Sequence, residues 1–567
     1  MIKILFSLKY FLDKNLKNKL LILFILYLIF PVVEFFNLSF FLTFLVSLFD
    51  PEKTNWLTSV ILNYNNNLEN LNIVIFSFLI IFFFASNLLM VYVNYKNYYI
   101  GEEVAANLGS RLFSRVISGK FINYIKFHPS EIIKKINIEI PILSAGVFQS
   151  ILQILSKSLI FLIFLIFIFF NFEKNSIFYI SIFVGIYVLI FFFFKKLLFN
   201  FGKKVSKLNS EINKNLYDSL NNFKILQLYK KEKFFFDQIS SHLYSQAKYK
   251  SFGYLIGQFP KSFIEFLAFS SLAIFFLYVR NRSGDSFLSQ IPQLGLIAFI
   301  GYRMLPITQQ IYSSFTLIKN SLYILNTIKS DFILYKKVDF NKNVRIKNFK
   351  KINQIKLKNI NFRYFDGPKI INAFNYNFKK NNIYLFFSKS GKGKTTLMNI
   401  LSGFLLPENN GKLFINNNQV DFKNLENLKN YTTYMPQFTH LFDRSLYENI
   451  TLDLESNFKR ENNKKYFSLI KKLGLNIELK RLIKNSNKKL GHKGSTLSGG
   501  QIQRIALARA FFGLKDVVIL DEPTNNLDEK NKFKVLNLIK NNKREKIIII
   551  LSHDEDLKRI ASKIIQI

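Results

Sequence analysis

The stretch Ser-Lys-Ser-Gly-Lys-Gly-Lys-Thr-Thr, residues 388–396, decides the fold of the C-terminal half of the chain. An apolar, strand-like run at 383–387 precedes it, and an apolar run with helical spacing follows at 397–404. A strand, a loop of small residues and a helix together present backbone N–H groups and a helix N-terminus to a phosphate group. In such a loop Lys394 reaches the β- and γ-phosphates of a nucleotide, and Thr395 binds Mg²⁺. A Gly- and Lys-rich turn without a ligand is the alternative for this stretch taken alone.

The segment at 517–522 supplies the carboxylates that a nucleotide site needs. It reads Val-Val-Ile-Leu-Asp-Glu, so an apolar strand ends in Asp521 and Glu522. In P-loop enzymes the first acid at this place holds Mg²⁺, and the second can polarise an attacking water. A strand that ends in a solvated acidic turn is the alternative. Because short apolar runs alternate with helical segments here, the sequence predicts a mostly parallel sheet with crossover helices, an α/β P-loop ATPase domain over 353–567.

Long uncharged apolar stretches fill the N-terminal half of the chain, and none comparable follows residue 319. A helix needs about 20 apolar residues to cross the hydrocarbon core of a bilayer. The sequence therefore predicts an α-helical polytopic membrane domain over 1–335, which a linker at 336–352 joins to the ATPase domain. Six transmembrane helices are expected, at 20–48, 70–95, 140–172, 175–194, 262–279 and 286–320.

Basic residues indicate the orientation of the predicted helices. The segments 96–135 and 195–261 hold seven and thirteen Lys and Arg residues. The connections at 50–69, 173–174 and 280–285 hold only one, one and two. Since Lys and Arg are retained on the cytoplasmic side, both termini are expected in the cytoplasm.

The charge excess is read as a property of the whole sequence rather than as a nucleic-acid site. The 567 residues include 78 Lys and Arg against 37 Asp and Glu, a formal net charge of +41. Of the basic residues 64 are Lys and 14 are Arg, as expected of an AT-rich genome, so no nucleic-acid partner is expected. The apolar content of 49% and the absence of Cys exclude a disordered chain and a disulfide-stapled secreted domain.

Further motifs surround the loop and the acidic strand. Leu-Ser-Gly-Gly-Gln stands at 497–501, Met-Pro-Gln at 435–437 and Asn-Leu-Asp at 526–528, and a histidine, His553, follows an apolar strand. In order and spacing these motifs resemble the nucleotide-binding domain of ABC transporters. Because six predicted spans precede that domain, the whole chain resembles a half-transporter of the type I ABC exporter kind.

The resemblance implies that ATP and Mg²⁺ are bound and assigns a role to each matching residue. It implies ATP contacts for an aromatic side chain, the phosphate loop and a glutamine, namely Tyr364, Ser388, Lys389, Ser390, Gly391, Lys392, Gly393, Lys394, Thr395, Thr396 and Gln437. It implies Mg²⁺ ligands at Thr395, Gln437 and Asp521. It implies that Glu522 activates water and that His553 contacts the γ-phosphate. Surface packing is the alternative for Tyr364.

Other motif residues are implied to act across a subunit interface. By resemblance, the site of the opposite subunit is completed by Ser498, Gly499, Gly500 and Gln501, and Asp528 belongs to the neighbouring D-loop. Because the chain has one such domain, a homodimer is expected. Two positions depart from the pattern. Ser388 stands where the loop has its first glycine, and His492 stands where exporters usually carry an acidic residue.

Two stretches of the membrane half resemble bacterial flippases for lipid-linked oligosaccharides, namely Asn-Asn-Phe-Lys-Ile at 221–225 and Tyr-Arg-Met-Leu-Pro at 302–306. Arg303 interrupts a long apolar span, and a charge at that depth is expected to face the bundle interior. A guanidinium suits bidentate binding of phosphate, so Arg303 is a candidate for a polyprenyl pyrophosphate head group. A structural ion pair with Glu34 or Glu265 is the alternative. Lys261 is a second candidate, with snorkelling to the interface as its alternative.

The sequence as a whole predicts ATP-driven export across a bacterial inner membrane. The expected cargo is a polyprenyl-linked oligosaccharide or related glycolipid, moved from the cytoplasmic to the outer leaflet. Export of lipid A, another lipid or a peptide is the alternative within the class, and a non-transporting or degenerate ATPase subunit of a heterodimer is the alternative from another class. Coupling is expected through the segments 121–129 and 226–236.

Overall fold

The structure is a computed structural model with two compact units. It describes residues 13–49, 68–125, 128–171, 174–283, 287–335, 351–387, 393–408, 411–420, 428–454, 464–485, 488–491, 494–513 and 515–566. The N-terminal unit comprises Met1–Gly119 and Ile125–Val338, and the C-terminal unit comprises Lys120–Tyr124 and Asp339–Ile567.

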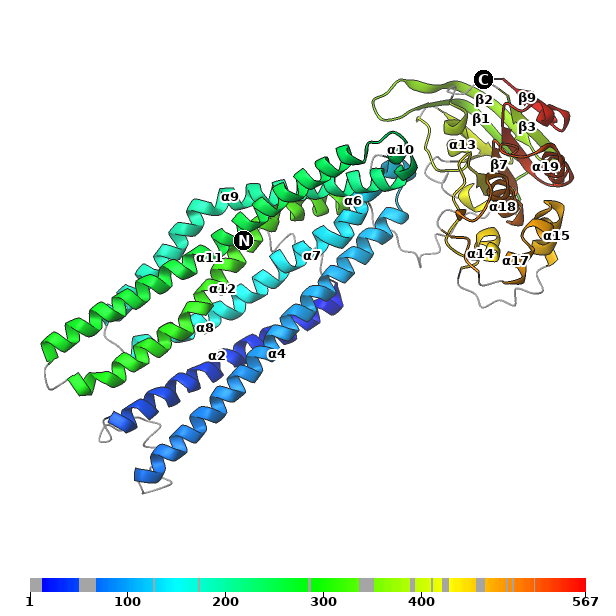
Figure 1. Cartoon of the computed structure of the whole chain (residues 1–567). Helices are drawn as coiled ribbons and strands as arrows, with labels where there is room; N and C mark the ends of the chain where they lie inside the picture. The colour runs from blue at the N-terminus through cyan, green and yellow to red at the C-terminus, as the bar shows by residue number, and fades with distance from the viewer. Residues whose placement is uncertain are drawn as a thin grey trace. The chain divides into compact units, whose positions relative to one another are not determined.

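The N-terminal unit consists of long helices (Figure 1). Its principal helices are α2 (Lys14–Phe49), α4 (Leu68–Ile117), α8 (Ser150–Asn171), α9 (Lys174–Asn221), α11 (Glu232–Ser283) and α12 (Phe287–Leu334). The shorter ones are α6 (Pro129–Lys134), α7 (Ile140–Leu143) and α10 (Phe223–Leu228). Within the described residues, these helices, together with a π-helical turn at Ser144–Gln149, contain all six stretches that the sequence predicts as spans. Three helical stretches there are long and apolar enough to cross a membrane by length and composition: Lys14–Leu45, Ile73–Ile117 and Pro129–Phe170.

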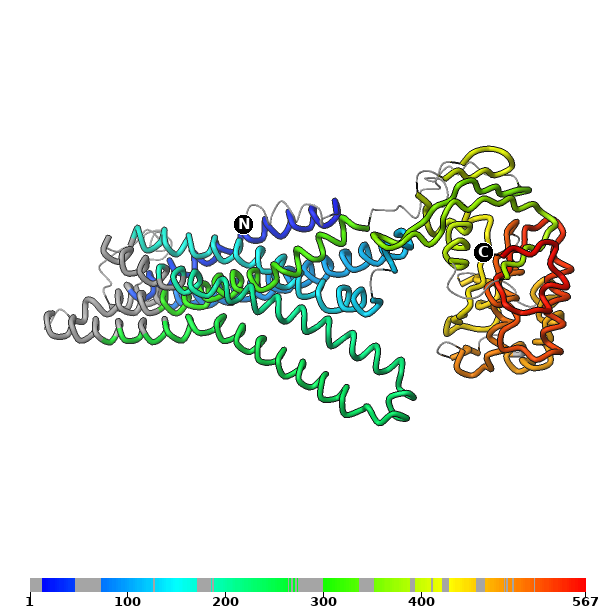
Figure 2. The backbone as a smooth tube through the Cα atoms, turned by 90° about the horizontal axis from the view of Figure 1, so that it is seen from above, coloured from blue at the N-terminus to red at the C-terminus, as the bar shows by residue number. Residues whose placement is uncertain are grey.

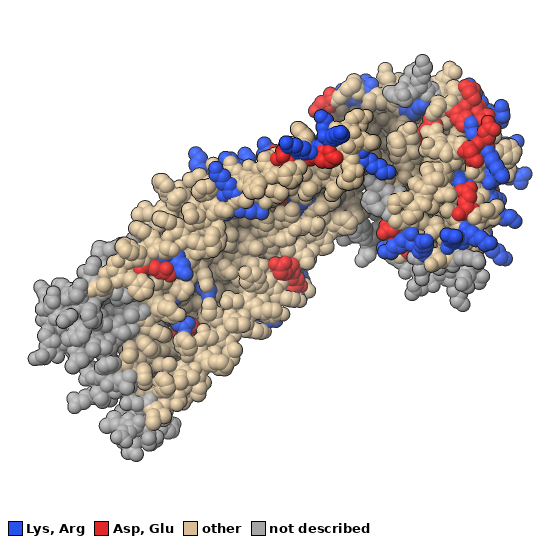
Figure 3. All heavy atoms as spheres, viewed as in Figure 1, with Lys and Arg blue, Asp and Glu red and all other residues tan. Residues whose placement is uncertain are grey.

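Apolar side chains lie on the outside of these helices as well as between them. Ile73 is 67% and Phe84 is 64% exposed on α4, whereas Ile75 of the same helix is fully buried. A helix that is apolar on every side suits a lipid bilayer, because exposing apolar side chains to lipid carries no free-energy penalty. The face in Figure 3 accordingly shows few charged side chains along α2 and α4.

The predicted single span from residue 140 differs from the observed helix in one respect. Two π-helical turns, η1 (Lys135–Glu139) and η2 (Ser144–Gln149), precede α8. Pro141 stands at the start of α7 between them, and its missing N–H removes one helical hydrogen bond. A buried ion pair of 2.9 Å, from Lys134 Nζ to Glu139 Oε1, holds the first turn.

Glycines allow two close contacts with α12 in the N-terminal unit. A Cβ atom at Gly202 of α9 would collide with the backbone oxygen of Asn320 on α12, and one at Gly146 would collide with Ser321. Small residues at such positions let membrane helices approach closely. Figure 2 shows α9 and α11 as a hairpin that diverges from the other helices of this unit toward its α10 end.

Two sheets organise the C-terminal unit. The antiparallel sheet has the order β2-β1-β4-β5, from β1 (Gln354–Arg363), β2 (Lys369–Lys379), β4 (Lys412–Ile415) and β5 (Asn418–Val420). The other has the order β6-β7-β8-β3-β9, and all its pairs are parallel. Its strands are β3 (Asn382–Phe386), β6 (Thr432–Met435), β7 (Val517–Asp521), β8 (Ile547–Leu551) and β9 (Lys563–Ile565). The prediction of a helical membrane domain followed by an α/β domain is confirmed.

Helices cover the parallel sheet and complete two apolar cores. They are α13 (Lys394–Leu401), α14 (Leu446–Thr451), α15 (Lys464–Lys472), α16 (Leu475–Glu478), α17 (Lys480–Lys484), α18 (Gly499–Phe512) and α19 (Glu529–Asn541). One core lies between the sheets and includes Phe378 and Ile549, and the other lies between the parallel sheet and α14–α19. A short helix, α5 (Phe121–Ile125), packs on the first core through Phe121, whose ring centroid lies 5.4 Å from that of Phe404.

Candidate functional site

The parallel register brings three strand ends to one edge of the sheet. Asp521 of β7 pairs with Leu551 of β8, and Leu551 pairs with Phe386 of β3. The segments that follow these residues therefore start side by side. They carry Glu522, Ser552 and His553, and the loop that leads into α13.

Glu522 is the centre of a hydrogen-bonded group at this edge. Its side chain is largely buried, and Oε2 accepts the hydroxyl hydrogen of Ser552 at 2.7 Å. The other carboxylate oxygen, Oε1, lies 2.8 Å from His553 Nδ1. The His553 side chain is 72% exposed, so its ring keeps a free face toward solvent. The fold thus joins two predicted catalytic residues through one short contact.

The backbone of Glu522 is held in an uncommon conformation. Its φ is +49°, in the left-handed region where a side chain costs free energy. The Glu522 N–H donates to Leu551 O at 2.8 Å, and the buried Gln503 Nε2 donates to Glu522 O at 2.7 Å. Ser552 and Gln503 were missed by the sequence interpretation, although Ser552 adjoins His553 and Gln503 stands two residues after the Leu-Ser-Gly-Gly-Gln motif.

Asp521 precedes Glu522 and has the properties of a cation ligand. Tyr434 Oη donates to Asp521 Oδ2 at 3.3 Å. Burial and the neighbouring Glu522 carboxylate raise the pKa of Asp521 to about 6, although Lys394 acts in the opposite direction. A divalent cation would favour the ionised carboxylate, and Mg²⁺ prefers hard oxygen ligands of the kind that Asp521 and Thr395 offer. Within the described residues no group of three or more His, Cys, Asp and Glu forms a preformed metal cage.

The phosphate loop is described from Gly393 onward, and its residues Ser388, Lys389, Ser390, Gly391 and Lys392 lie outside the described residues. Gly393 caps α13 with φ +77°, and a Cβ atom there would lie 2.8 Å from Ile370 Cγ2. Only glycine fits both the conformation and the space.

The start of α13 carries Lys394, Thr395 and the buried Thr396. Tyr364 reaches this point, since its Oη lies 3.3 Å from Thr396 Oγ1. Gln437 is exposed and follows β6, the strand next to β7. Tyr364 follows β1, Gln437 follows β6, and Gly393 to Thr396 lie at the start of α13. These residues are the described part of the predicted ATP site that accompanies Asp521 and Glu522.

The Leu-Ser-Gly-Gly-Gln residues form an exposed turn at the N-terminus of α18. Ser498 is the N-cap: its Oγ accepts from Gln501 N at 3.3 Å, while Ser498 N donates to Gln501 Oε1 at 3.1 Å. A Cβ atom at Gly500 would lie 2.8 Å from Asn526 O, so the turn packs closely on the segment before α19. Asp528 caps α19 by accepting from Asn531 N. Ser498 and Gly499 face solvent, and His492 lies outside the described residues.

The predicted cargo residues have partners in the N-terminal unit. Arg303 Nη1 lies 3.4 Å from Glu34 Oε1, and its guanidinium stands 4.6 Å from the Phe83 ring centroid. Both partners of the ion pair are largely buried. Of the two carboxylates considered from the sequence, the structure selects Glu34. Lys261 Nζ lies 3.7 Å from Glu265 Oε1 one turn along α11, and its side chain is 46% exposed.

Comparisons with known proteins agree with this arrangement. A family model described as the ABC transporter transmembrane region matches residues 10–300, and one described as ABC transporter matches residues 371–525. A solved structure of a bacterial Atm1-family ABC exporter with ATP bound superposes with a TM-score of 0.79 at 15% identity, covering 98% of this chain and 94% of that chain. At that identity the likeness shows the fold.

Curated relatives match over shorter stretches. A probable ABC transporter ATP-binding/permease protein of Haemophilus influenzae is 31% identical over 220 residues, 39% of each chain. A putative export ATP-binding/permease protein of Rickettsia prowazekii is 34% identical over 201 residues, 35% of this chain and 34% of its own. An ATP-dependent lipid A-core flippase of Francisella tularensis is 29% identical over 211 residues, 37% of this chain and 34% of its own.

The chain thus spans between 34% and 39% of the length of these three relatives. The transmembrane-region model alone covers more than half of the chain, and the second model follows it over residues that include β3, β7 and Glu522. The chain therefore belongs to the ABC transporter family.

Proposed function

We propose that the chain is one half of an ATP-driven exporter in a bacterial inner membrane, with both termini in the cytoplasm. The observation that carries the proposal is the contact of Glu522 with Ser552 and His553 at the strand edge beside α13. A buried carboxylate between a hydroxyl donor and an imidazole can accept a proton from an attacking water. The match of residues 10–300 to the ABC transporter transmembrane region supports a link between this chemistry and transport.

The residues of the edge have distinct parts in the proposed hydrolysis. Lys394 and the N–H groups at the start of α13 bind the β- and γ-phosphates. Thr395, Gln437 and Asp521 hold Mg²⁺, which neutralises charge on the phosphate oxygens when bound. Glu522 orients water and takes its proton, while His553 contacts the γ-phosphate from the exposed side. Tyr364 stacks on adenine.

The exposed turn at Ser498 supports a dimer. The turn presents the exposed Ser498 and Gly499 and a helix N-terminus to solvent, which is a surface suited to phosphate. In the proposed homodimer this turn, with Gly499, Gly500 and Gln501, completes the ATP site of the other subunit, and Asp528 lies beside it. Closure of two such sites shifts the helical units from inward to outward access.

A cargo with an anionic head group is supported by the buried charges near Arg303. Arg303 Nη2 is buried without a hydrogen-bond partner, so one edge of the guanidinium can still receive an acceptor. Lys157 adds a second buried cation that interacts with Glu34. A polyprenyl-linked oligosaccharide carries a pyrophosphate that suits this pair of cations. Lipid A-core is the second candidate, because a flippase for it is among the relatives.

The proposal is tested with purified protein reconstituted in liposomes. Wild type is expected to hydrolyse ATP, and Glu522→Gln is expected to lose at least a hundred-fold in kcat, in the range for a general base. Equal rates in both proteins would remove the catalytic assignment. Stimulation by lipid-linked oligosaccharide but not by lipid A supports the first cargo, and the reverse pattern supports the second. Activity that requires a second, different half-transporter would replace the homodimer by a heterodimer.

A further inference from the structure

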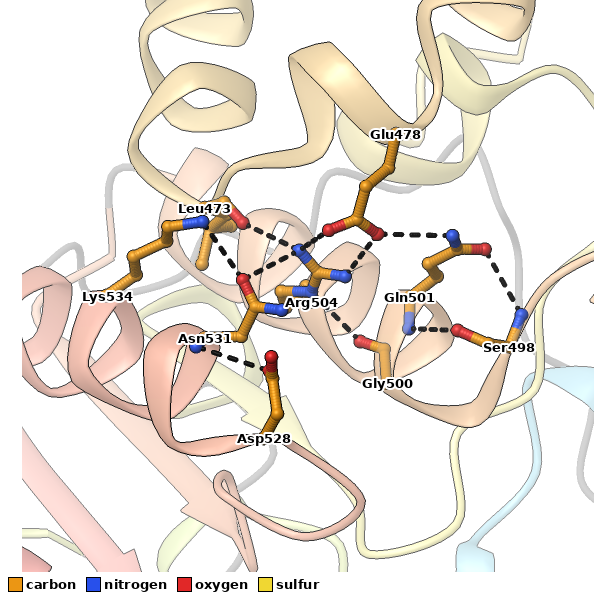
Figure 4. Close-up of polar contacts among 9 residues, drawn as sticks. All are labelled: Leu473, Glu478, Ser498, Gly500, Gln501, Arg504, Asp528, Asn531 and Lys534. Carbon is orange, nitrogen blue, oxygen red and sulfur yellow. Dashed lines mark hydrogen bonds and ion pairs between the residues drawn. The ribbon is translucent and has the colours of Figure 1, made fainter.

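A network of polar contacts surrounds the N-terminal turns of α18 and joins three elements of the C-terminal unit (Figure 4). We call it the α18 network. Its members are Glu478 of α16, Ser498, Gly500, Gln501 and Arg504 at the start of α18, Asp528 and Asn531 at the start of α19, and the contacting residues Leu473 and Lys534.

Arg504 is the centre of the α18 network. Its side chain is 3% exposed. Its guanidinium donates two hydrogen bonds to the Glu478 carboxylate, from Nη1 to Oε1 at 2.8 Å and from Nη2 to Oε2 at 2.5 Å. Two backbone oxygens accept from it as well, Leu473 O at 3.1 Å and Gly500 O at 3.3 Å. The Glu478 side chain is 34% exposed, so the pair lies at the surface with only its arginine buried. Bidentate geometry fixes the relative orientation of the two side chains, so α16 and α18 are held in one geometry.

Glu478 also contacts the exposed turn at Ser498, through Gln501. Its Oε2 accepts from Gln501 Nε2 at 3.1 Å, which orients the amide so that Gln501 Oε1 faces the N–H of Ser498. The Ser498 hydroxyl in turn accepts from Gln501 N. A reversed amide would place two acceptors against each other at Glu478. The capping box at Ser498 therefore depends on the carboxylate of another helix.

A second arm leads from Arg504 to α19. Nη1 also donates to Asn531 Oδ1 at 3.2 Å, and Lys534 Nζ donates to the same oxygen at 3.0 Å. The backbone N–H of Asn531 donates to Asp528 Oδ1 at 3.3 Å. The side chain of one residue thus connects the turn at Ser498 with the capped start of α19 at Asp528.

We propose that Arg504 is a positioning residue that makes the Ser498–Gly500 turn and the start of α19 one rigid surface for the nucleotide of a partner subunit. The inference rests on the proposed function, because only a turn that receives a nucleotide needs to be preordered. An exposed turn that is already ordered loses little conformational entropy when it binds. The hydrogen bonds from Arg504, followed by that from Gln501, hold the pKa of Glu478 below its ordinary value, so the carboxylate stays ionised to lower pH than a free glutamate.

The test compares Glu478→Gln with wild type in the purified full-length protein. A glutamine has the same shape, but it lacks the charge and turns one acceptor into a donor toward Arg504. We expect kcat for ATP to fall at least five-fold, because the turn must be ordered at each closure. The Kd of a fluorescent ATP analogue for the subunit's own phosphate loop is expected to stay within two-fold of wild type.

Arg509→Lys is the matched control. Arg509 lies on α18, the helix that also carries Arg504. It donates to Asn449 O at 2.7 Å and to Asn449 Oδ1 at 3.1 Å, away from the Ser498 turn. Both variants are expected to unfold at lower temperature than wild type, and only Glu478→Gln is expected to lose turnover when measured well below its unfolding temperature. A loss of turnover in Arg509→Lys equal to that in Glu478→Gln would overturn the positioning role.

A double variant separates action through the turn from a general effect. If Glu478 acts through Ser498, then Glu478→Gln combined with Ser498→Ala is no slower than the slower single variant. Multiplied losses, or a kcat of Glu478→Gln within two-fold of wild type, overturn the inference. Asn531→Ala removes only the contacts of the second arm and replaces Glu478→Gln as the test if that variant does not fold. We expect Asn531→Ala to lower kcat at least three-fold. A kcat of Asn531→Ala within two-fold of wild type would also overturn the inference. If wild type itself shows no Glu522-dependent ATPase, the proposed function has failed instead.

Discussion

Ser552 donates its hydroxyl hydrogen to Glu522 Oε2 over 2.7 Å, and both groups are buried. Substitution by alanine leaves that carboxylate oxygen without its donor and frees the side chain to rotate. We expect Ser552→Ala to lower kcat for ATP about ten-fold, which corresponds to about 1.4 kcal/mol of transition-state stabilisation. Steady-state ATPase of the purified protein measures it, with Ser562→Ala as control, because Ser562 Oγ accepts from the backbone of β3 instead. Unchanged turnover in Ser552→Ala would mean that the hydroxyl does not position Glu522.

Two glycines of α9 differ in what surrounds them. A Cβ atom at Gly202 would overlap the backbone oxygen of Asn320, whereas nothing lies within 4 Å of one at Gly185. Overpacking costs about 1–3 kcal/mol, so Gly202→Ala is expected to lower the unfolding temperature in detergent while Gly185→Ala does not. The measurement is the unfolding temperature of each variant compared with wild type. Because alanine favours a helix more than glycine does, helix propensity alone would stabilise both variants. A drop of the same size at both positions would mean that the contact with α12 is not responsible.

The Arg303–Glu34 pair predicts a large penalty for removing one charge. Its side chains are 15% and 4% exposed, so Glu34→Gln leaves a buried guanidinium uncompensated, at a cost of about 3–5 kcal/mol. Lys261→Gln breaks a half-exposed pair on α11 and is expected to change stability by less than about 1 kcal/mol. The double variant Glu34→Gln, Arg303→Gln should recover part of the loss. No difference between Glu34→Gln and Lys261→Gln would contradict the buried pairing.

The ion pair between Glu478 and Arg504 predicts a pH dependence. Hydrogen bonds from Arg504 lower the pKa of Glu478 below its ordinary value. A carboxyl with a lowered folded pKa stabilises the native state above its unfolded pKa, and this stabilisation is lost as the pH falls through the folded pKa. The difference in unfolding temperature between wild type and Glu478→Gln should therefore be constant above about pH 5 and shrink below about pH 4. A difference that widens on acidification would reverse the sign of the linkage.

The fold class was predictable because periodicity and length are local properties. The apolar runs at 383–387, 517–520 and 547–551 correspond to β3, β7 and β8, and their order in the sheet explains why Glu522 and His553 meet. The six apolar stretches of the N-terminal half lie within the observed helices.

Residues that act through distant partners were not predictable. Nothing in the local sequence of Glu478 indicates Arg504, 26 positions later, and Gln503 supports Glu522 only because α18 lies across the end of β7. The sequence left Arg303 with two possible carboxylates, since either span could neighbour its helix. Only tertiary packing distinguishes Glu34 from Glu265.

The two π-helical turns before α8 have a consequence for mapping a transport path. Each turn adds one residue to its loop, which rotates the side chains beyond it by about 100° relative to an uninterrupted α-helix. A cysteine-labelling scan is simple here, because the natural sequence contains no Cys. Along 129–171, the positions that label should follow one helical wheel before Lys135, an offset wheel over Ile140–Leu143 and a third, again offset, after Gln149.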